Sequence, residues 1–167
     1  IAGDRINQMR IYKDELICTG PKGIFKMKHI FVVNPTAGEG SLQKTLEEQL
    51  QKFAGTKEYE IYATKGPGDA TLFVRNYVSA HPEESLRFYA CGGDGTLNET
   101  VTGLLRSGVK TPLGYIPTGT TNDFAASLGL SHNPVQAAKD ILEGEVHAYD
   151  AGRFGERFFS YVASFGA

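Results

Sequence analysis

The chain has 167 residues, a formal net charge of −2, 41% hydrophobic residues and 22% charged residues. These ordinary values make disorder a poor default, and they give no support to nucleic-acid binding, which needs clustered Lys and Arg. The two cysteines, Cys18 and Cys91, have the spacing of neither a disulfide framework nor a zinc site, so we expect a reducing, cytoplasmic setting. No apolar run is long enough to span a bilayer, so any membrane role should be peripheral.

Residues 1–26 are weakly patterned, and we treat them as an N-terminal extension of undefined role. From Met27 onward, strand-like and helix-like segments alternate regularly. The expected strands are 29–33, 58–64, 86–91 and 113–116. Helices are expected between and after them, at 41–53, from 69 to about 78, at 96–105, briefly at 122–128, and at 134–142. Ser41 and Asp69 can cap the first two helices, Gly108 can end the third, and the last stops near Gly144.

Strands separated by helices predict an α/β fold with a parallel sheet. In such sheets, ligands bind beyond the carboxyl ends of the strands. The last part of the chain, from His147, reads as a strand, a turn around Gly155 and another strand. Because the sequence stops inside the strand-like run 158–165, we expect it to be a piece of a longer protein. The expected organisation is therefore an α/β domain at 27–145 and the first strands of a second, β domain at 146–167.

Three clusters of small and polar residues follow the expected strands. They are Asn34-Pro35-Thr36-Ala37-Gly38, Gly92-Gly93-Asp94-Gly95-Thr96-Leu97-Asn98-Glu99 and Pro117-Thr118-Gly119-Thr120-Thr121-Asn122-Asp123-Phe124. Phosphates need backbone N–H donors at close range, and glycines permit that approach. A helix N-terminus adds favourable dipole charge, and the cluster after the third strand has this layout of strand, glycine turn and helix. The clusters therefore predict a phosphate-binding site.

The common phosphate-binding motifs are absent from the sequence. It contains no G-x-x-x-x-G-K-[ST] P-loop, no protein-kinase set of H-R-D and D-F-G, and no G-x-G-x-x-G dinucleotide fingerprint. The site must therefore bind phosphate in another way.

Asp94 stands within the glycine turn, where a carboxylate would repel phosphate unless a metal ion or a hydroxyl lay between them. It could contact magnesium or a ribose hydroxyl, or take part in proton abstraction. The alternative is a structural role as an Asx-turn or helix cap, which is the commoner role of an Asp-Gly pair. Asn122 and Asp123 likewise suit either a helix cap or ligand contact.

These motifs, in this order, resemble those of the diacylglycerol kinase catalytic domain family, which includes sphingosine and ceramide kinases and bacterial lipid kinases. The resemblance runs from about Met27 to the end of the chain and includes further matches. These are Tyr62-Ala63-Thr64, Gly68-Asp69-Ala70, Ile116 and Val162-Ala163-Ser164-Phe165-Gly166. The family implies a parallel-sheet nucleotide-binding domain of the NAD kinase and diacylglycerol kinase type, followed by a β-sandwich domain.

The resemblance also implies the site residues. ATP would be bound by Asn34, Pro35, Thr36, Ala37, Gly38, Thr64, Gly92, Gly93, Asp94, Gly95, Thr96, Leu97, Asn98, Glu99, Thr118, Gly119, Thr120, Asn122 and Asp123. Asp94 is the expected catalytic residue and a candidate contact for the Mg²⁺ that accompanies ATP. The main catalytic base and a structural magnesium site would lie in the second domain, beyond Ala167, so residues 1–167 alone should be inactive.

The function that the resemblance implies is transfer of the γ-phosphate of ATP to a lipid hydroxyl, with a diacylglycerol-like acceptor first. The enzyme would be cytoplasmic, would meet its lipid at the membrane surface and would bind no nucleic acid; assembly as a homodimer stays open. Two alternatives remain: a small-molecule kinase like NAD kinase or phosphofructokinase, and a nucleotide-binding module without catalysis. Asn98-Glu99 and Asn34-Pro35 favour the lipid-kinase branch over the first.

Overall fold

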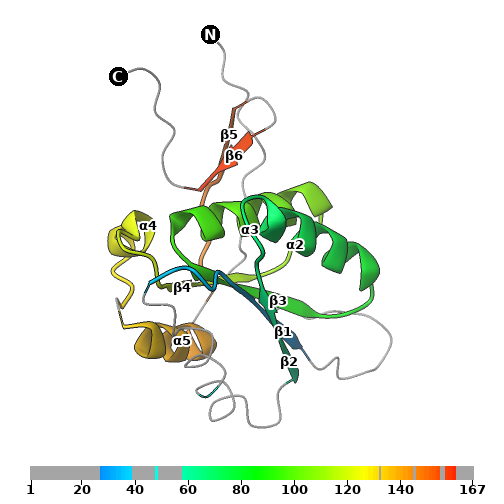
Figure 1. Ribbon diagram of the computed structural model, residues 1–167. Helices are drawn as coiled ribbons and strands as arrows, with labels where there is room; N and C mark the ends of the chain where they lie inside the picture. Colours follow the sequence, from blue (N-terminus) through cyan, green and yellow to red (C-terminus); the bar gives the residue numbers. More distant parts are fainter. Residues whose placement is uncertain are drawn as a thin grey trace.

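The computed structural model of the chain describes residues 27–38, 48, 58–131, 133–144, 146–154 and 157–160. Four parallel strands form its main sheet, in the order β2-β1-β3-β4 (Figure 1). Their bounds are β1 Lys28–Val33, β2 Glu58–Ala63, β3 Leu86–Gly92 and β4 Leu113–Pro117. The expected parallel α/β sheet is confirmed, and each strand lies within one residue of the range expected at either end.

The strand order determines which loops lie together at the carboxyl ends of the strands. β1 pairs with β2 on one side and with β3 on the other, so the direction in which the chain winds changes between β1 and β3. The register aligns Val33, at the end of β1, with Ala63 of β2 and Cys91 of β3. The segments that follow these strands therefore emerge together at one edge, which is where open α/β sheets bind ligands.

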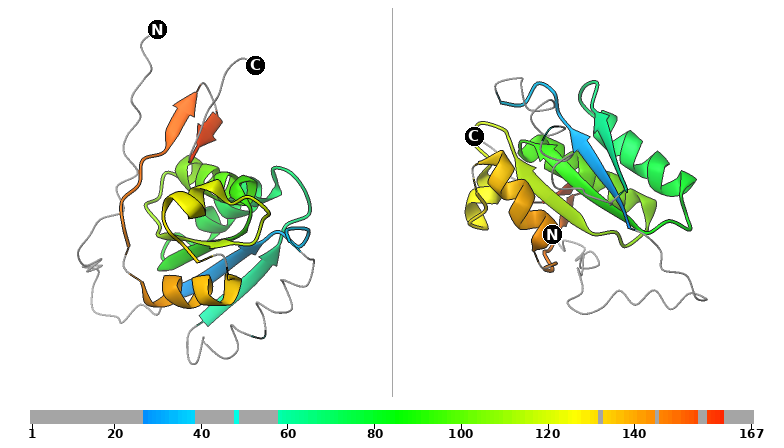
Figure 2. Two further views of the ribbon diagram at one scale, coloured as in Figure 1. Left: turned by 90° about the vertical axis from the view of Figure 1, so that its left-hand side faces the viewer. Right: turned by 90° about the horizontal axis from the view of Figure 1, so that it is seen from below.

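Helices cover both faces of the sheet. α2 (Asp69–Ala80) and α3 (Asp94–Ser107) lie side by side on one face, and α5 (Pro134–Glu143) lies on the other (Figures 1 and 2). The short helix α4 (Asp123–Ser127) follows β4 after a turn. As expected, α3 is followed by Gly108, whose φ of 71° is left-handed, and α5 by Gly144.

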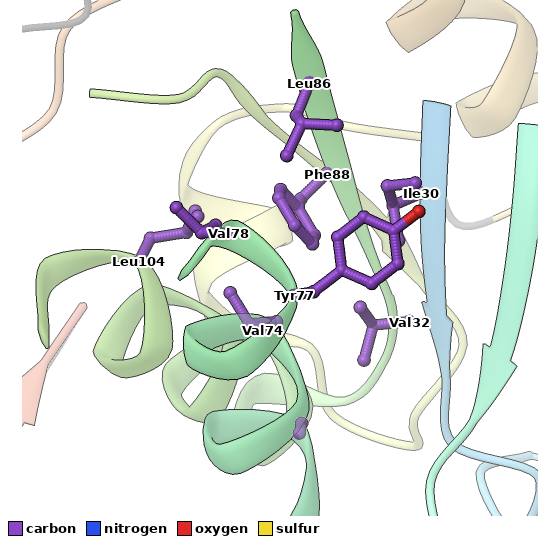
Figure 3. Close-up of a cluster of buried hydrophobic side chains, with 9 residues drawn as sticks. Ile30, Val32, Val74, Tyr77, Val78, Leu86, Phe88 and Leu104 are labelled. Carbon is purple, nitrogen blue, oxygen red and sulfur yellow. The ribbon is translucent and has the colours of Figure 1, made fainter. Parts of the chain in front are cut away.

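The face under α2 and α3 holds an apolar cluster in which aliphatic side chains surround Phe88 and Tyr77 (Figure 3). Gly103 of α3 lets the two helices approach closely, because a Cβ there would lie 2.9 Å from the carbonyl oxygen of Thr71 and 2.8 Å from Val74 Cβ. This contact fixes the position of α2 relative to α3. Truncating one large buried side chain of this apolar cluster to alanine would lower the free energy of unfolding by roughly 2–5 kcal/mol.

The opposite face packs Phe31, Tyr89 and Cys91 against α5. The rings of Phe31 and Tyr89 are stacked 4.4 Å apart, and burial raises the pKa of Tyr89 to about 12. Cys91 is fully buried, and its burial raises the pKa of the thiol well above the ordinary value. Cys91 therefore packs as a small apolar side chain.

Beyond the sheet, β5 (Gly152–Phe154) and β6 (Arg157–Phe159) form the expected antiparallel hairpin, which lies next to α3 (Figure 2). Several expectations lie outside the described residues: the 1–26 extension, the strand-like run after residue 160, and the helix at 41–53 except for Glu48, which is helical. Within the described ranges, no helix is long and apolar enough to cross a membrane.

Candidate functional site

The three clusters predicted from the sequence meet at the carboxyl edge of the sheet. Each turn continues the hydrogen bonding of the strands before it leaves the sheet. Asn34 N–H donates to the carbonyl oxygen of Cys91 at 2.8 Å, and Thr118 N–H donates to that of Gly92 at 2.9 Å. Thr64, after β2, donates to the carbonyl oxygen of Val33 at 2.8 Å. The starts of all these turns are therefore fixed by the sheet itself.

The turns also touch one another through glycines. Gly38, with φ 67°, ends the turn after β1, and a Cβ there would lie 2.8 Å from the carbonyl oxygen of Thr118. A Cβ on Gly119 would lie 2.6 Å from Gly93 Cα, a separation that real Cβ atoms essentially never show. The turn after β4 can therefore lie against both other turns only because these positions lack side chains.

The N-terminus of α3 opens into this arrangement. Its N-cap residue, Gly93, has an extended backbone and no side chain with which to cap the first turn. The first helical hydrogen bond runs from Leu97 N–H to the carbonyl oxygen of Gly93. The N–H groups of Asp94, Gly95 and Thr96 thus have no partner within the helix ladder, and such groups together with the helix dipole attract anions.

Asp94 lies in the first turn of α3, but its carboxylate holds a different helix. Its Oδ2 accepts a hydrogen bond from Asp123 N–H at 2.9 Å, and its Oδ1 accepts one from Phe124 N–H at 3.3 Å. These are the first two backbone N–H groups of α4, so Asp94 supplies the cap of that helix from 29 residues away. The structural alternative raised for Asp94 is thus realised at α4 and not within its own turn.

Asn122 shapes the turn itself. This residue has left-handed backbone angles (φ 50°), and its side chain pairs with Gly119 by accepting from the N–H and donating to the carbonyl oxygen. Asn122 is the N-cap residue of α4 by position, yet its side chain does not cap the helix. Of the two roles left open for Asn122 and Asp123, the cap is therefore contradicted, because Asp94 accepts from the first two donors of α4, while ligand contact stays a prediction.

Tyr115, near the end of β4, is a site residue that the sequence did not indicate. Its hydroxyl lies 3.3 Å from Asp94 Oδ1 and 3.2 Å from Asn122 Oδ1, and it donates to these oxygens. Burial raises the pKa of Tyr115 above its ordinary value, and the negative charge of Asp94 acts in the same direction. The neutral phenol therefore ties β4 to both turns. The only sequence signal was a tyrosine two residues before Pro117.

The loop after β2 is held by two carboxylates. Asp69 was expected to cap α2, but this is wrong: Gly68 is the N-cap residue, and Asp69 Oδ2 accepts from Lys65 N–H at 2.8 Å and from the Tyr62 hydroxyl at 2.9 Å. The other carboxylate is Glu99 of α3, whose Oε1 accepts from Gly68 N–H at 2.8 Å. Glu99 was expected to contact ATP; its Oε1 contacts this loop, and the contact with ATP stays a prediction.

The remaining predicted residues divide between ligand-accessible and structural positions. Thr36 and Thr120 are exposed, while Pro35, like Thr64, is half-buried; Ala37 is buried. Asn34 Oδ1 accepts hydrogen bonds from both the N–H and the hydroxyl of Thr36, which folds the first turn on itself. The Leu97 side chain belongs to the apolar core, so only its backbone could meet a ligand.

Two buried polar atoms near the turns have no hydrogen-bond partner within the described residues: Asn98 Oδ1 and Thr118 Oγ1. Thr118 is 8% exposed and stands in the turn beside Gly119. A buried polar atom without a partner is costly, and a ligand that supplies the missing partner removes that cost. Among the same residues, no group of three or more His, Cys, Asp or Glu side chains could form a metal cage.

Comparison with known proteins agrees with this arrangement. The family model of the diacylglycerol kinase catalytic domain matches residues 28–154. The diacylglycerol kinase of Bacillus subtilis (strain 168) is 39% identical over 142 residues, which cover 81% of this chain and 44% of that protein. The diacylglycerol kinase of Staphylococcus carnosus (strain TM300) is 36% identical over 137 residues, with the same coverage of 81% and 44%. The chain thus spans less than half the length of these relatives.

A solved structure shares the fold as well. The crystal structure of a diacylglycerol kinase from Bacillus anthracis str. Sterne superposes with a TM-score of 0.67 at 33% sequence identity, over 83% of this chain and 47% of that one. The fold that carries the three clusters is therefore shared with this structure. The chain belongs to the diacylglycerol kinase catalytic domain family, and its sheet is the NAD kinase-like sheet of that family.

Proposed function

We propose that this chain is the nucleotide-binding part of an enzyme that transfers the γ-phosphate of ATP to a lipid hydroxyl, with diacylglycerol as the first candidate acceptor. The observation that carries the proposal is the N-terminus of α3, where the N-cap residue is Gly93. The turn that contains Gly119 lies against it, at the switch point of the sheet. Membership of the diacylglycerol kinase catalytic domain family supports the reaction type.

The phosphates are bound by backbone groups. The N–H groups of Asp94, Gly95 and Thr96 point out of the first turn of α3, and Gly95 has open space around it, since a Cβ there would meet nothing within 4 Å. The Thr118 hydroxyl, which is buried at the adjoining turn and has no partner within the described residues, is a further candidate donor. Binding of this kind holds the triphosphate in line for attack and supplies charge stabilisation.

The residues present fit a magnesium ion that arrives with the nucleotide. Mg²⁺ is usually bound by one or two carboxylates together with phosphates and several waters, and this mode needs no protein cage of three or more ligands. Asp94 and the exposed Asp123 are the carboxylates beside the phosphate turns that would hold it. When bound, the ion neutralises charge on the phosphates during transfer.

Besides this contact with magnesium, Asp94 positions α4 in the proposal, since both of its oxygens accept hydrogen bonds from that helix. The carboxylate that takes the proton of the acceptor hydroxyl is then expected in the second domain that the family resemblance implies, with residues 146–167 leading into it. The acceptor is a lipid presented at the surface of the cytoplasmic membrane leaflet, to which the enzyme binds peripherally.

The test is a radiolabelled ATP transfer assay with full-length protein and mixed micelles. Diacylglycerol, ceramide, a sphingoid base and NAD are offered in parallel, with and without magnesium. The expected result is magnesium-dependent label in a lipid, with diacylglycerol labelled most strongly. Label in NAD and in no lipid would contradict the proposal and favour a small-molecule kinase, and ATP binding without any transfer would favour a module without catalysis.

A further inference from the structure

Glu99 makes a side-chain hydrogen bond that its sequence motif does not predict. It lies more than one turn into α3, and its Oε1 accepts a hydrogen bond from Gly68 N–H, 31 residues earlier in the chain. Gly68 is the N-cap residue of α2 and has a left-handed backbone with φ 83°. The carboxylate therefore fastens the start of one helix to the body of another, in addition to the packing between them.

The segment fastened in this way is the 64–68 loop. It begins at Thr64, which bonds to the end of β1, and it passes Lys65, whose N–H donates to Asp69. Because β1 and β2 end in register, this loop borders the carboxyl edge of the sheet on the side of β2, next to the turn after β1. It is thus one wall of the site, while α3 begins on the other side, at β3.

We infer that Glu99 is a positioning residue for nucleotide binding: it sets the 64–68 loop against the phosphate turn through Gly68, without touching the ligand. The inference rests on the proposed function, because it presumes that a nucleotide occupies the edge of the sheet. The bond needs an acceptor oxygen at Glu99 but no negative charge, and this requirement separates a positioning role from a direct contact with magnesium or phosphate.

Three variants of the protein distinguish these roles. Glu99→Ala removes the acceptor, and Glu99→Gln keeps an acceptor oxygen while it removes the charge. Thr71→Val is the matched control, because it removes the other hydrogen bond between the same helices, from the Thr71 hydroxyl to the carbonyl oxygen of Glu99 at 2.9 Å. The readouts are amide hydrogen exchange at Gly68 in the nucleotide-free protein, the Kd of ATP with magnesium, and the KM for ATP and kcat of transfer.

Glu99→Ala should speed exchange at Gly68 by about tenfold, the order expected for loss of one hydrogen bond to a charged acceptor. The Kd and KM for ATP should rise roughly three- to tenfold, because without the bond the 64–68 loop is held less firmly in the position that binds ATP. The kcat should stay within about twofold of the wild type. Glu99→Gln should restore most of both the exchange rate and the KM, to within about threefold of the wild type, because a neutral acceptor oxygen keeps the bond but forms a weaker one than a charged oxygen. Thr71→Val should leave exchange at Gly68 unchanged.

Two results would overturn the inference. The first is an unchanged KM for ATP in Glu99→Ala together with wild-type binding of ATP. The second is an equal defect in Glu99→Gln and Glu99→Ala, which would make the charge itself the contributor and point to direct contact with the ligand. A wild-type protein that binds no ATP would instead contradict the proposed function, while exchange at Gly68 would still report whether the bond to Glu99 forms.

Discussion

Two helices of this protein begin with the same Gly-Asp pair, and the two aspartates act over different distances. At Gly68-Asp69, the carboxylate accepts from Lys65 N–H and the Tyr62 hydroxyl, so it folds the loop just before its own helix. At Gly93-Asp94, it accepts from two N–H groups of α4 and from Tyr115, in a distant part of the chain. The same dipeptide therefore holds a local loop in one place and joins two turns of the candidate site in the other.

The glycines of the two regions differ in a related way. A Cβ on Gly68 would meet nothing within 4 Å, so its left-handed backbone is what favours glycine there. A Cβ on Gly119 would lie 2.6 Å from Gly93 Cα and 2.9 Å from Asn122 Oδ1. There is thus space for a side chain at Gly68 in the local loop, but not at Gly119, between the turns that Asp94 joins. Substitutions should therefore affect the second region far more than the first.

The largest effect is expected for Gly119→Ala. The added methyl group must push the turn after β4 away from Gly93, which should cost roughly 1–3 kcal/mol of unfolding free energy. A displacement of about 1 Å at a site that aligns reacting groups can lower activity about 100-fold. Urea unfolding and the ATP transfer assay measure the two effects. Stability and transfer both close to the wild type would show that the turns do not need this contact.

Gly95→Ala is the matched control for that substitution. Gly95 lies in the first turn of α3, close to Gly93, but a Cβ there would have open space. An alanine within a helix should raise the unfolding free energy by about 0.5–1 kcal/mol. If phosphates approach the backbone at Gly95, ATP affinity should nevertheless fall, so that stability and binding change in opposite directions. Unchanged affinity would place the phosphates away from Gly95.

The next largest effect is expected for Asp94→Asn against Asp69→Asn. Asp94→Asn places an amide group against the N–H donors of α4, so the unfolding free energy should fall by about 1–3 kcal/mol. Transfer should fall roughly 10- to 100-fold, because Asp94 positions the turns around the phosphates and any magnesium contact is weakened as well. Asp69→Asn should cost about 1 kcal/mol of stability.

The two variants are compared by kcat, KM for ATP and urea unfolding. For Asp69→Asn, we expect transfer to stay within about tenfold of the wild type, since its bonds are local to the 64–68 loop. Asp94→Asn activity within a few-fold of the wild type would remove Asp94 from the mechanism. Equal defects in both variants would end the distinction between a local and a long-range aspartate.

The smallest effect concerns pH. Burial raises the pKa of Tyr115 above the usual tyrosine value of about 10, so the folded protein keeps the phenol neutral where the unfolded chain ionises. The stability that this provides is complete below about pH 10 and is lost as the pH rises above it. Tyr62 has a raised pKa from burial and from Asp69, but it is half-buried and should contribute less.

Urea unfolding between pH 8 and 11.5 tests this difference. The wild type should lose stability above about pH 10. Tyr115→Phe should make that loss shallower and lower stability by about 1 kcal/mol at neutral pH, through the lost hydroxyl bonds. Tyr62→Phe should leave the alkaline slope nearly unchanged, while Tyr89, whose pKa is about 12, contributes equally in all three proteins. Equal slopes in Tyr115→Phe and the wild type would contradict the prediction.

The fold was predictable because its signals are local. Short β-branched and aromatic runs marked each strand of the main sheet, and Gly108 and Gly144 marked the ends of α3 and α5. The convergence of the three clusters followed from the parallel topology alone, since all strands end at one edge. The hairpin at β5 and β6 likewise followed from a turn between two short runs.

The hydrogen bonds of the site were not predictable in the same way. For α4, a cap from Asn122 or Asp123 was one of two open alternatives, whereas Asp94 provides the cap. The cap of α2 was expected from Asp69, which accepts from Lys65 and Tyr62 instead. Propensities describe which residue type stands at a helix start, but a carboxylate 29 residues away competes for the same donors once the chain is folded. Tyr115 was missed for this reason also.

The burial of Cys91 has a practical consequence for measuring these variants. Its sulfur lies in a central strand at 0% exposure, and its raised pKa keeps the thiol protonated at neutral pH. A chromogenic disulfide reagent can therefore react with Cys91 only after the strands around it separate. In a Cys18→Ser background, the rate of this labelling under native conditions reports how often the sheet opens. Cys91 can thus serve as an intrinsic probe of sheet opening, and no attached dye is needed.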